Sequence, residues 1–327
     1  MSRPPLKRIG VLTSGGDAPG MNAAIRSVVR TASQRGWTTL GIKRGYAGLM
    51  LGDMEELGPR SVSSIIQRGG TILRTSRAKA FETLDGQRQA AEALERSRVD
   101  GLVLIGGDGT FRGAADLAKV WPGQLVGIPG TIDNDLSGTD FTIGFDTAVN
   151  TALTAIDRIR DTAEAHERFF VVEVMGRRAG FIALAVGIAG GAEDILLPET
   201  PTDLAAISGR LCQARAKGKT SSILVVAEGD DEGGAFRIAE QLSQRSGCEH
   251  RVVVLGHLQR GGSPTAQDRV LAAKLGAFAV EVLGRGDTGV MVGEVRGELV
   301  TTPFAATWQR KKPLDQVLLT LIPILAA

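Results

Sequence analysis

Short apolar runs alternate along the chain with longer segments in which apolar residues recur at helical spacing. Eight of these runs predict strands, over Arg8–Leu12, Thr39–Ile42, Gly101–Ile105, Leu125–Ile128, Phe169–Val174, Ile195–Leu197, Ile223–Ala227 and Val252–Leu255. Strands that are apolar throughout and are joined by helices are typical of parallel sheets covered on both faces. The predicted fold class is therefore α/β, with doubly wound, mainly parallel sheets.

Two of the intervening segments predict helices most clearly. In the segment Thr147–Thr162, apolar residues recur at spacings of four, three and three, at Val149, Leu153, Ile156 and Ile159. The segment Gln87–Arg96 is rich in Ala, Glu, Gln and Arg, which all favour helix.

Length and glycine content change this picture in two ways. At roughly 150 residues per domain, a chain of 327 residues predicts about two domains. Glycine accounts for 43 of these residues, about 13% where ~7% is usual. Much of the glycine follows apolar runs, where a strand would end, which excludes a disordered chain, a collagen and a coiled coil.

Charge and cysteine content exclude several function classes. The 38 basic and 36 acidic residues give a net charge of +2, which argues against nucleic acid as a partner. Cys212 and Cys248 are too few for a disulfide framework, which fits a reducing compartment. The apolar tail Val317–Ala327 is shorter than a membrane span and contains Pro323. We expect a cytoplasmic protein with no membrane partner and with this tail buried.

Three glycine-rich turns follow predicted strands, within residues 9–26, 101–118 and 125–136. Ligands of open parallel sheets lie beyond the carboxyl ends of the strands, where glycine lets backbone N–H groups approach a phosphate. Asp108 lies inside the second turn, in GGDGT, where a carboxylate would repel a phosphate unless Mg²⁺ bridges the two. The turns predict a phosphate site with magnesium; a nicotinamide site is the weaker alternative.

The third turn brings together two carboxylates, Asp133 and Asp135, behind Thr131. Two close carboxylates suit general-base chemistry, because one can abstract a proton while the other shapes its environment. A solvated Asx turn is the competing interpretation. The preceding apolar strand and Pro-Gly pair favour the functional one.

Basic residues lie near strand ends in the second half of the chain. They are Arg168, Arg177, Arg178, Arg251, His257 and Arg260. Because the guanidinium fork of Arg matches phosphate, this set predicts a site for an anionic metabolite. Glu228, at the end of an apolar strand, could accept hydrogen bonds from sugar hydroxyls. No His and Cys spacing fits zinc.

Five motifs in this order carry a family resemblance: GVLTSGGDAPGMNAAIR, IGGDGT, PGTIDND, VVEVMGR and LGHLQRGGSP. Together they resemble the bacterial-type ATP-dependent 6-phosphofructokinases over essentially the whole chain. GGDGT alone is shared with other kinases, whereas PGTIDND is much more specific. The resemblance implies transfer of the ATP γ-phosphate to the 1-hydroxyl of fructose 6-phosphate.

The resemblance also implies roles for individual residues. Asp133 would be the general base, Asp135 its supporting carboxylate, Thr131 a contact of the transferring phosphate, and Arg177 a cation that stabilises the transition state. These would act with further substrate contacts at Met175, Gly176, Glu228, His257 and Arg260, joined by Arg168 and Arg251 from a neighbouring subunit. The ATP site would comprise Gly15, Arg77, Ala78, Gly107, Asp108, Gly109 and Thr110, with Mg²⁺ at Asp108.

The family fold implies two Rossmann-like lobes that assemble as a homotetramer with shared active sites. By analogy, residues 1–143 and 258–307 would form the nucleotide-binding lobe. Residues 144–257 and 308–327 would form the lobe that binds fructose 6-phosphate.

Two positions bear on the phosphoryl donor. Pyrophosphate-dependent members of the family usually carry Asp at the position of Gly109 and Lys at that of Gly130. Glycine at both positions leaves room for a nucleotide and favours ATP, with a pyrophosphate-dependent enzyme as the alternative. Ala78 stands where an aromatic residue is common, which removes a stacking surface for the nucleotide. A non-catalytic, effector-binding subunit is disfavoured because the residues of the base and the metal site are present.

Overall fold

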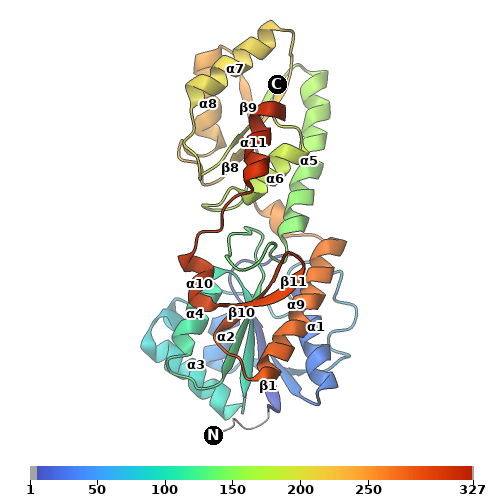
Figure 1. Ribbon diagram of the computed structural model, residues 1–327, viewed down its shortest axis with the longest axis vertical. Helices are drawn as coiled ribbons and strands as arrows, with labels where there is room; N and C mark the ends of the chain where they lie inside the picture. The colour runs from blue at the N-terminus through green and yellow to red at the C-terminus, as the bar shows by residue number, and fades with distance from the viewer. Residues whose placement is uncertain (1–5, 326–327) are drawn as a thin grey trace. The chain divides into compact units, whose positions relative to one another are not determined.

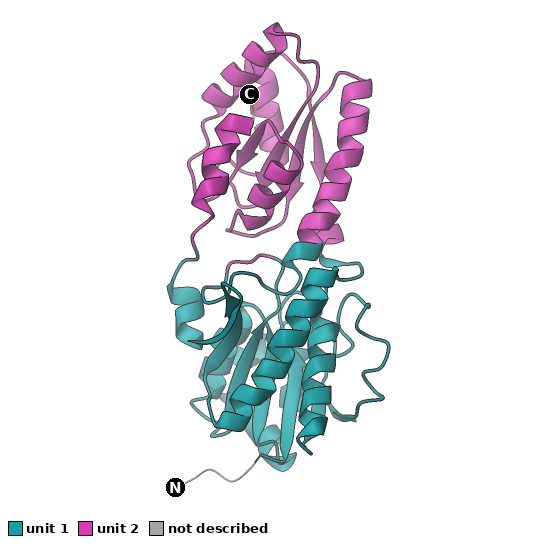
Figure 2. Ribbon diagram, turned by 45° about the vertical axis from the view of Figure 1, so that its right-hand side comes forward, with its two compact units in different colours: residues 1–132, 136–147, 260–312 teal, residues 133–135, 148–259, 313–327 magenta. Residues whose placement is uncertain are grey.

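The computed structural model describes residues 6–325. The described chain divides into two compact units, drawn in different colours in Figure 2. Unit 1 contains the chain up to Ile132, with Leu136–Thr147 and Arg260–Lys312. Unit 2 contains Asp133–Asp135 and Ala148–Gln259, with the chain from Pro313 onward.

Unit 1 is built on a seven-stranded sheet in the order β11-β10-β5-β4-β1-β2-β3. The strands are β1 (Arg8–Thr13), β2 (Thr38–Ile42), β3 (Met54–Leu57), β4 (Gly101–Gly106), β5 (Gln124–Pro129), β10 (Val290–Val295) and β11 (Glu298–Pro303). The five inner strands pair in parallel, and β3 and β11 pair antiparallel at the two edges. Strands β4 and β5 are buried along their whole length, as expected for the middle of a covered sheet.

Helices cover the sheet of unit 1. They are α1 (Met21–Gln34), α2 (Gly45–Leu51), α3 (Leu84–Arg96), α4 (Asp108–Leu117), α9 (Ala266–Arg285) and α10 (Phe304–Gln309), with the 3₁₀ turn η1 (Lys79–Glu82). Helices α1 and α9 lie side by side (Figure 1). Under α2, α3, α4 and α10 lies an apolar cluster in which the rings of Phe111 and Phe304 stack with centroids 5.4 Å apart. This core includes residues of β1, β2, β4, β5 and β10, so it packs these helices onto the inner strands.

Unit 2 is built on a four-stranded parallel sheet in the order β7-β8-β6-β9. The strands are β6 (Phe169–Val174), β7 (Asp194–Leu196), β8 (Ser222–Ala227) and β9 (His250–Val254). The helices are α5 (Phe145–Ala165), whose first residues belong to unit 1, α6 (Phe181–Ala189), α7 (Leu204–Ala216), α8 (Ala235–Ser246) and α11 (Gln316–Leu325), with the 3₁₀ turn η2 (Gly256–Arg260). Val171, Leu224 and Val226 of the sheet pack against α7 and α8 in an apolar cluster.

The structure confirms the predicted α/β fold class and all eight predicted strands, with ends that shift by one or two residues. The two predicted helices are the inner parts of α5 and α3. The expectation of a buried tail is wrong for the described part of the tail. Helix α11 lies against α6 and β7, but none of its described residues is fully buried, and Val317 is 66% exposed. Among residues 6–325, no helix is both long and apolar enough to cross a membrane.

Candidate active site

The first residues of the three glycine-rich turns lie together in unit 1, at the carboxyl ends of β1, β4 and β5. The backbone N–H of Ser14 donates to the carbonyl of Ile105 at 3.0 Å, and Thr110 Oγ1 donates to the carbonyl of Ser14 at 3.2 Å. The N–H of Gly130 donates to the carbonyl of Gly106 at 3.0 Å. Turns that begin at residues 14, 107 and 130 therefore form one edge, where ligands of open parallel sheets bind.

Glycine at position 106 is required by the closeness of these turns. A Cβ atom on Gly106 would lie 2.2 Å from Thr110 Oγ1 and 2.5 Å from the carbonyl oxygen of Ser14. Both distances are shorter than any real contact of a Cβ atom. Only glycine lets β4 end this close to the first turn.

Tyr46 holds the second turn, residues 107–110, through a hydrogen bond. Its hydroxyl donates to the carbonyl of Thr110 at 2.6 Å, and its ring stacks on Phe81. Burial, with a smaller effect from Asp116, raises the pKa of Tyr46 well above its usual value. Tyr46 therefore remains a neutral hydrogen-bond donor and holds Thr110 in place.

Helix α4 begins in the second turn, with Gly107 at its N-cap and Asp108 in its first turn. Asp108 Oδ2 lies 3.6 Å from Arg112 Nε on the same helix, and both side chains are partly exposed. Among residues 6–325, no three His, Cys, Asp or Glu side chains gather as a metal cage. One accessible carboxylate beside a glycine-rich turn is a donor set that fits Mg²⁺ arriving with a phosphate ligand, because Mg²⁺ prefers one or two carboxylates plus phosphates.

The loop after β5 carries Thr131 and then the two candidate carboxylates. Thr131 is buried, and Thr142 Oγ1 donates to its carbonyl at 2.6 Å. A Cβ atom on Gly107 would lie 3.6 Å from the Cβ atom of Thr131. Thr131 therefore lies beside the GGDGT turn.

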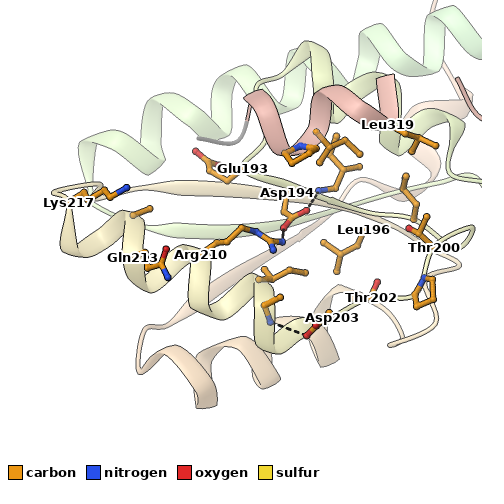
Figure 3. Close-up of a pocket in the computed structure, with 18 residues that line it drawn as sticks. Glu193, Asp194, Leu196, Thr200, Thr202, Asp203, Arg210, Gln213, Lys217 and Leu319 are labelled. Atoms are coloured by element: carbon orange, nitrogen blue, oxygen red, sulfur yellow. Dashed lines mark hydrogen bonds and ion pairs between the residues drawn. The ribbon is translucent and has the colours of Figure 1, made fainter. Parts of the chain in front are cut away.

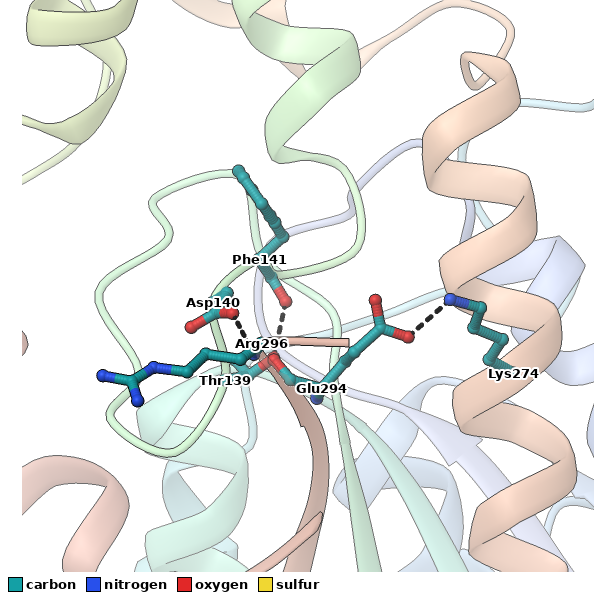
Figure 4. A network of polar contacts seen from close by, with 6 residues as sticks. All are labelled: Thr139, Asp140, Phe141, Lys274, Glu294 and Arg296. Carbon is teal, nitrogen blue, oxygen red and sulfur yellow. Dashed lines mark hydrogen bonds and ion pairs between the residues drawn. The ribbon is translucent and has the colours of Figure 1, made fainter. Parts of the chain in front are cut away.

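The later part of this loop is clamped onto the β10–β11 hairpin (Figure 4). The N–H of Asp140 donates to the carbonyl of Glu294 at 2.8 Å, and the N–H of Arg296 donates to Asp140 Oδ2 at 2.6 Å. Thr139 Oγ1 accepts from the N–H of Glu294 at 3.2 Å, while Lys274 Nζ on α9 lies 2.6 Å from Glu294 Oε2. The hairpin thereby anchors the segment that follows Asp133 and Asp135.

Asp268, in the first turn of α9, anchors the end of the loop. Its carboxylate accepts hydrogen bonds from the N–H groups of Gly144 and Thr147, both at 2.8 Å, and from the Thr147 hydroxyl. Burial raises the pKa of Asp268, and these hydrogen bonds act in the opposite direction. Because the carboxylate satisfies N–H groups at the start of α5, it fixes the point at which the loop becomes helix.

Asp133 belongs to unit 2 and lies against Arg177. The Asp133 side chain is 4% exposed, and its Oδ2 lies 3.6 Å from Arg177 Nε. Arg177 follows the end of β6 and has a φ of 55°, a conformation that costs a non-glycine residue on the order of 1–3 kcal/mol. Glu228, at the end of β8, holds it there, because its Oε1 accepts from the Arg177 N–H at 2.6 Å. Asp133, Arg177 and Glu228 thus form one cluster within unit 2.

Gln259 is a member of this region that the sequence analysis missed. It is fully buried, and its Oε1 accepts from the N–H of Met175 at 3.4 Å while its Nε2 donates to the carbonyl of Gly256 at 3.2 Å. It ties the end of β6 to η2, which carries His257. Its only signal in the sequence is its place inside the motif GHLQRGGSP.

The structure does not bring all the basic residues to this cluster. His257 is exposed beyond the carboxyl end of β9, the end of the sheet at which Arg177 and Glu228 lie. Arg168 precedes β6, and Arg251 near the start of β9 pairs with Glu249 at 3.4 Å. Six residues of β6 separate Arg168 from the carboxyl end, about 20 Å at ~3.3 Å per residue. Arg168 and Arg251 therefore lie at the far end of the sheet from Arg177 of their own chain.

The remaining candidates lie in unit 1. Arg260 Nη1 donates to the carbonyl of Asp17 at 3.3 Å, and its guanidinium packs on Gly16 in the first turn. Arg77 is exposed, and Ala78 packs against the core beside η1. Both lie at the end of a long segment, residues 58–78, that contains no helix or strand.

A separate cavity of about 620 Å³ lies in unit 2, between α7, β7 and α11 (Figure 3). Its walls combine apolar residues with charged ones, and Arg210 and Asp194 of its lining form an ion pair. None of the candidate site residues, all of which lie within the described chain, lines it. The cavity is therefore distinct from the residues discussed above.

Comparison with known proteins identifies what this arrangement resembles. The family model described as phosphofructokinase matches residues 8–283. The chain is 59% identical over 321 residues to ATP-dependent 6-phosphofructokinase 1 of Thermus thermophilus, with 98% of this chain and 100% of the relative covered. It is 51% identical over 331 residues to ATP-dependent 6-phosphofructokinase of Halothermothrix orenii, with 98% and 100% covered.

A solved structure shares the fold as well. The phosphofructokinase of Pichia pastoris in the T-state superposes with a TM-score of 0.88 at 32% identity, covering 100% of this chain and 40% of that longer chain. These matches extend over nearly the whole chain, and the family model spans all three glycine-rich turns and the cluster of Asp133, Arg177 and Glu228. The chain therefore belongs to the phosphofructokinase family.

Proposed function

We propose that the protein is an ATP-dependent 6-phosphofructokinase, a phosphotransferase of glycolysis with an alcohol group as acceptor. It transfers the γ-phosphate of ATP to the 1-hydroxyl of D-fructose 6-phosphate and yields fructose 1,6-bisphosphate and ADP. The observation that carries this proposal is the pairing of a nearly buried carboxylate, Asp133, with Arg177 at 3.6 Å. The full-length relatives that carry the same activity in their names support it.

In this proposal, Asp133 is the general base that takes the proton of the 1-hydroxyl. Asp135 supports it, Thr131 contacts the transferring phosphate, and Arg177 compensates the charge that develops on that phosphate. Phosphoryl transfer needs mainly positioning and charge compensation, since little covalent chemistry falls to the protein. Glu228, Met175, Gly176 and His257 lie at the same end of the unit 2 sheet as Arg177, where they would bind the sugar; Arg260, in unit 1, would bind its phosphate.

The nucleotide would lie along the glycine-rich turns of unit 1. Gly15, the Gly107–Thr110 turn, Arg77 and Ala78 would contact it, and Asp108 would hold Mg²⁺. When bound, the metal neutralises charge on the β- and γ-phosphates. Asp108 is half-exposed at the start of α4, so its carboxylate is accessible to a metal that enters with ATP.

ATP is favoured over pyrophosphate as the donor by the space at Gly109. A Cβ atom there would meet nothing within 4 Å, so glycine leaves an open path beside the second turn for the rest of a nucleotide. The relatives at 59% and 51% identity are both named as ATP-dependent.

A shared active site would complete the sugar pocket. Arg168 and Arg251 lie at the end of the unit 2 sheet opposite to Arg177, so they cannot bind the same sugar phosphate as their own Arg177. We assign them to the active site of a neighbouring subunit within a cytoplasmic homotetramer. In this scheme, residues 1–143 and 258–307 serve the nucleotide, and residues 144–257 and 308–327 serve the sugar.

A coupled assay tests the proposal directly. Purified protein is supplied with fructose 6-phosphate and Mg²⁺, together with either ATP or pyrophosphate, and formation of fructose 1,6-bisphosphate is followed. We expect turnover with ATP and none with pyrophosphate alone. Turnover with pyrophosphate alone would contradict the donor assignment, and no turnover with either donor would contradict the activity.

A further inference from the structure

The segment of residues 58–78 lacks helix and strand, yet parts of it are buried. Val62, Ile65 and Leu73 are at most 4% exposed. Long irregular segments that pack in this way are usually functional. Its next-to-last residue is Arg77, the proposed nucleotide contact, so the contacts that hold the segment also set the position of Arg77.

Asn22, in the first turn of α1, holds the middle of this segment. It is 1% exposed. Its Nδ2 donates to the carbonyls of Arg68 and Gly69 at 3.0 and 3.2 Å, and its Oδ1 accepts from the N–H of Ile72 at 2.8 Å. The carboxamide uses both its donors and its acceptor on backbone atoms of one short stretch, residues 68–72. No other side chain of the described residues makes as many hydrogen bonds to this stretch.

A second contact fixes the chain between Ile72 and Arg77. Thr13, fully buried at the end of β1, lies with its Oγ1 3.0 Å from Thr71 Oγ1 and 3.0 Å from the carbonyl oxygen of Arg74. Arg74 has a φ of 61°, which a non-glycine residue adopts only where its surroundings enforce it. The strained residue lies three positions before Arg77.

The other side of the segment is also clamped. Ser263 Oγ donates to the carbonyl of Gln67 at 2.8 Å. A Cβ atom on Gly69 would lie 2.2 Å from the carbonyl oxygen of Gly262, so the two backbones touch. The stretch of residues 67–72 is therefore enclosed between Asn22 and residues 262–263.

We propose that Asn22 is a positioning residue for nucleotide binding: its carboxamide fixes residues 68–72 and so presents Arg77 to the phosphates of the nucleotide. This inference rests on the proposed function, because it takes Arg77 to contact ATP. The hydrogen bonds of the Asn22 carboxamide to the segment all go to backbone atoms.

The decisive variant is Asn22→Asp. It keeps the size and the acceptor for Ile72 but replaces both donors with an oxygen that faces the carbonyls of Arg68 and Gly69. We expect KM for ATP to rise on the order of tenfold, as follows when buried acceptors lose their donors, while kcat stays within a few-fold of wild type. Ser27→Ala is the matched control, because Ser27 lies on the same helix and its hydroxyl bonds only the carbonyl of Ala273 at 2.7 Å. Its KM for ATP should not change.

A double variant separates positioning from general destabilisation. If Asn22 acts through Arg77, Asn22→Asp adds little to the rise in KM for ATP that Arg77→Ala causes alone. Multiplicative effects of the two changes would overturn the proposal. If Arg77→Ala leaves KM for ATP unchanged, Arg77 does not contribute to nucleotide binding. That result would contradict both the proposed role of Arg77 and the inference about Asn22. If Arg77→Ala raises that KM and Asn22→Asp does not, only the inference fails.

Asn22→Ser serves if Asn22→Asp yields no folded protein. It removes the carboxamide without burying a charge, and the room it leaves can hold water. The same rise in KM for ATP is expected. Loss of folded protein in both variants, with Ser27→Ala folded, would show that Asn22 is needed only for stability and would overturn the proposal.

Discussion

Arg177 Nε lies 3.6 Å from Oδ2 of Asp133, and the two side chains differ sharply in exposure, 58% for the arginine and 4% for the carboxylate. The exposed arginine side chain has room to adjust to a charge that moves, whereas the enclosed carboxylate has little room to move. Burial of the carboxylate strengthens the electrostatic attraction of the pair, and water around the exposed arginine screens part of it. This asymmetry suits a fixed base and an adaptable charge-stabilising cation.

Asp133→Ser should lower kcat on the order of 10²–10⁴-fold, because the serine hydroxyl cannot take the proton of the sugar hydroxyl at neutral pH. KM for fructose 6-phosphate should change far less, since most of the proposed contacts to the sugar come from other residues. Steady-state kinetics with ATP measure both constants. Asp203→Ser is a matched control in unit 2, because serine retains the N-cap oxygen that Asp203 supplies to Ala205 and Ala206. Turnover near wild type in Asp133→Ser would refute the assignment of the base.

Glu228 should have two separable effects, because its carboxylate holds Arg177 and is also proposed to bind the sugar. Glu228→Gln keeps an oxygen that can accept from the Arg177 N–H, a hydrogen bond of 2.6 Å in the wild type, so kcat should be largely retained. Because the negative charge proposed to bind the sugar is lost, KM for fructose 6-phosphate should rise. Glu228→Ala removes the acceptor and releases Arg177 from its left-handed conformation, so kcat should fall as well, on the order of tenfold. Equal kcat values for the two variants would show that Glu228 does not position Arg177.

Active sites shared between subunits predict complementation. Asp133→Ser subunits lack the base, and Arg251→Ala subunits lack a cation that serves their neighbour. Each homo-oligomer should be impaired. When the two are unfolded, mixed and refolded together, hybrids contain some sites with both residues intact, and activity should exceed the sum of the separate samples. Mixing each variant with itself is the control, and an additive result would place Arg251 outside the neighbour's site.

Much of the fold follows from the sequence because burial leaves a clear signal there. Strand β6 occupies the predicted residues Phe169–Val174, since a central strand of a covered sheet is apolar throughout. Strands β3 and β11 were not predicted, because both are antiparallel edge strands with exposed polar residues. Strand β10 was also missed; it pairs with β11 as a hairpin that a search for strand–helix alternation overlooks.

The candidate site is predictable only as far as residues lie in recognisable turns. Asp133 and Arg177 come from separate motifs, and the structure brings them together. Gln259 and Asn22 could not be predicted from the sequence, because the role of a buried amide depends on the backbone atoms around it. No local sequence pattern indicates which backbone atoms these are. The tail is a related case: its apolar composition suggested burial, yet α11 packs with only one side against α6 and β7.

The free energy of unfolding should decrease at acidic pH, and part of this decrease should come from protonation of His250. This residue is buried at the start of β9, with Nδ1 2.9 Å from the carbonyl oxygen of Cys248, and burial lowers its pKa below the ordinary 6.5. In the unfolded chain, His250 therefore takes up a proton near pH 6.5, whereas in the folded chain it takes up this proton only at lower pH. This contribution to stability is complete above pH 6.5 and is lost as pH falls toward the folded pKa.

The measurement for His250 is urea unfolding of wild type and His250→Asn at pH 7.5 and at pH 5.5. Between these pH values, the free energy of unfolding should decrease more in wild type than in the variant, which has no imidazole to protonate. Subtracting the variant removes the contributions of other groups, such as Asp230 and Asp268, whose pKa values are raised by burial. Equal decreases would show that His250 does not contribute to the acid sensitivity.

Gly109 should determine whether the second turn accepts a nucleotide. An Asp at this position has room, because a Cβ atom meets nothing within 4 Å, so Gly109→Asp should fold with an unchanged Tm. Its carboxylate would add a second negative charge next to Asp108 where phosphates are expected, and KM for ATP should rise at least about tenfold through like-charge repulsion. Lysine at Gly130 is not accommodated as readily, since a Cβ atom there lies 2.8 Å from Ile105 Cγ2. We therefore expect the single change to impair use of ATP without creating use of pyrophosphate.

Gly209→Asp provides the control for this change. Gly209 lies on α7 in unit 2, and a Cβ atom there also meets nothing within 4 Å. The same added charge, far along the chain from the glycine-rich turns, should leave KM for ATP unchanged. If Gly109→Asp and Gly209→Asp had the same KM for ATP as wild type, the open space at Gly109 would have no part in nucleotide binding, and the structural argument for ATP over pyrophosphate would fail.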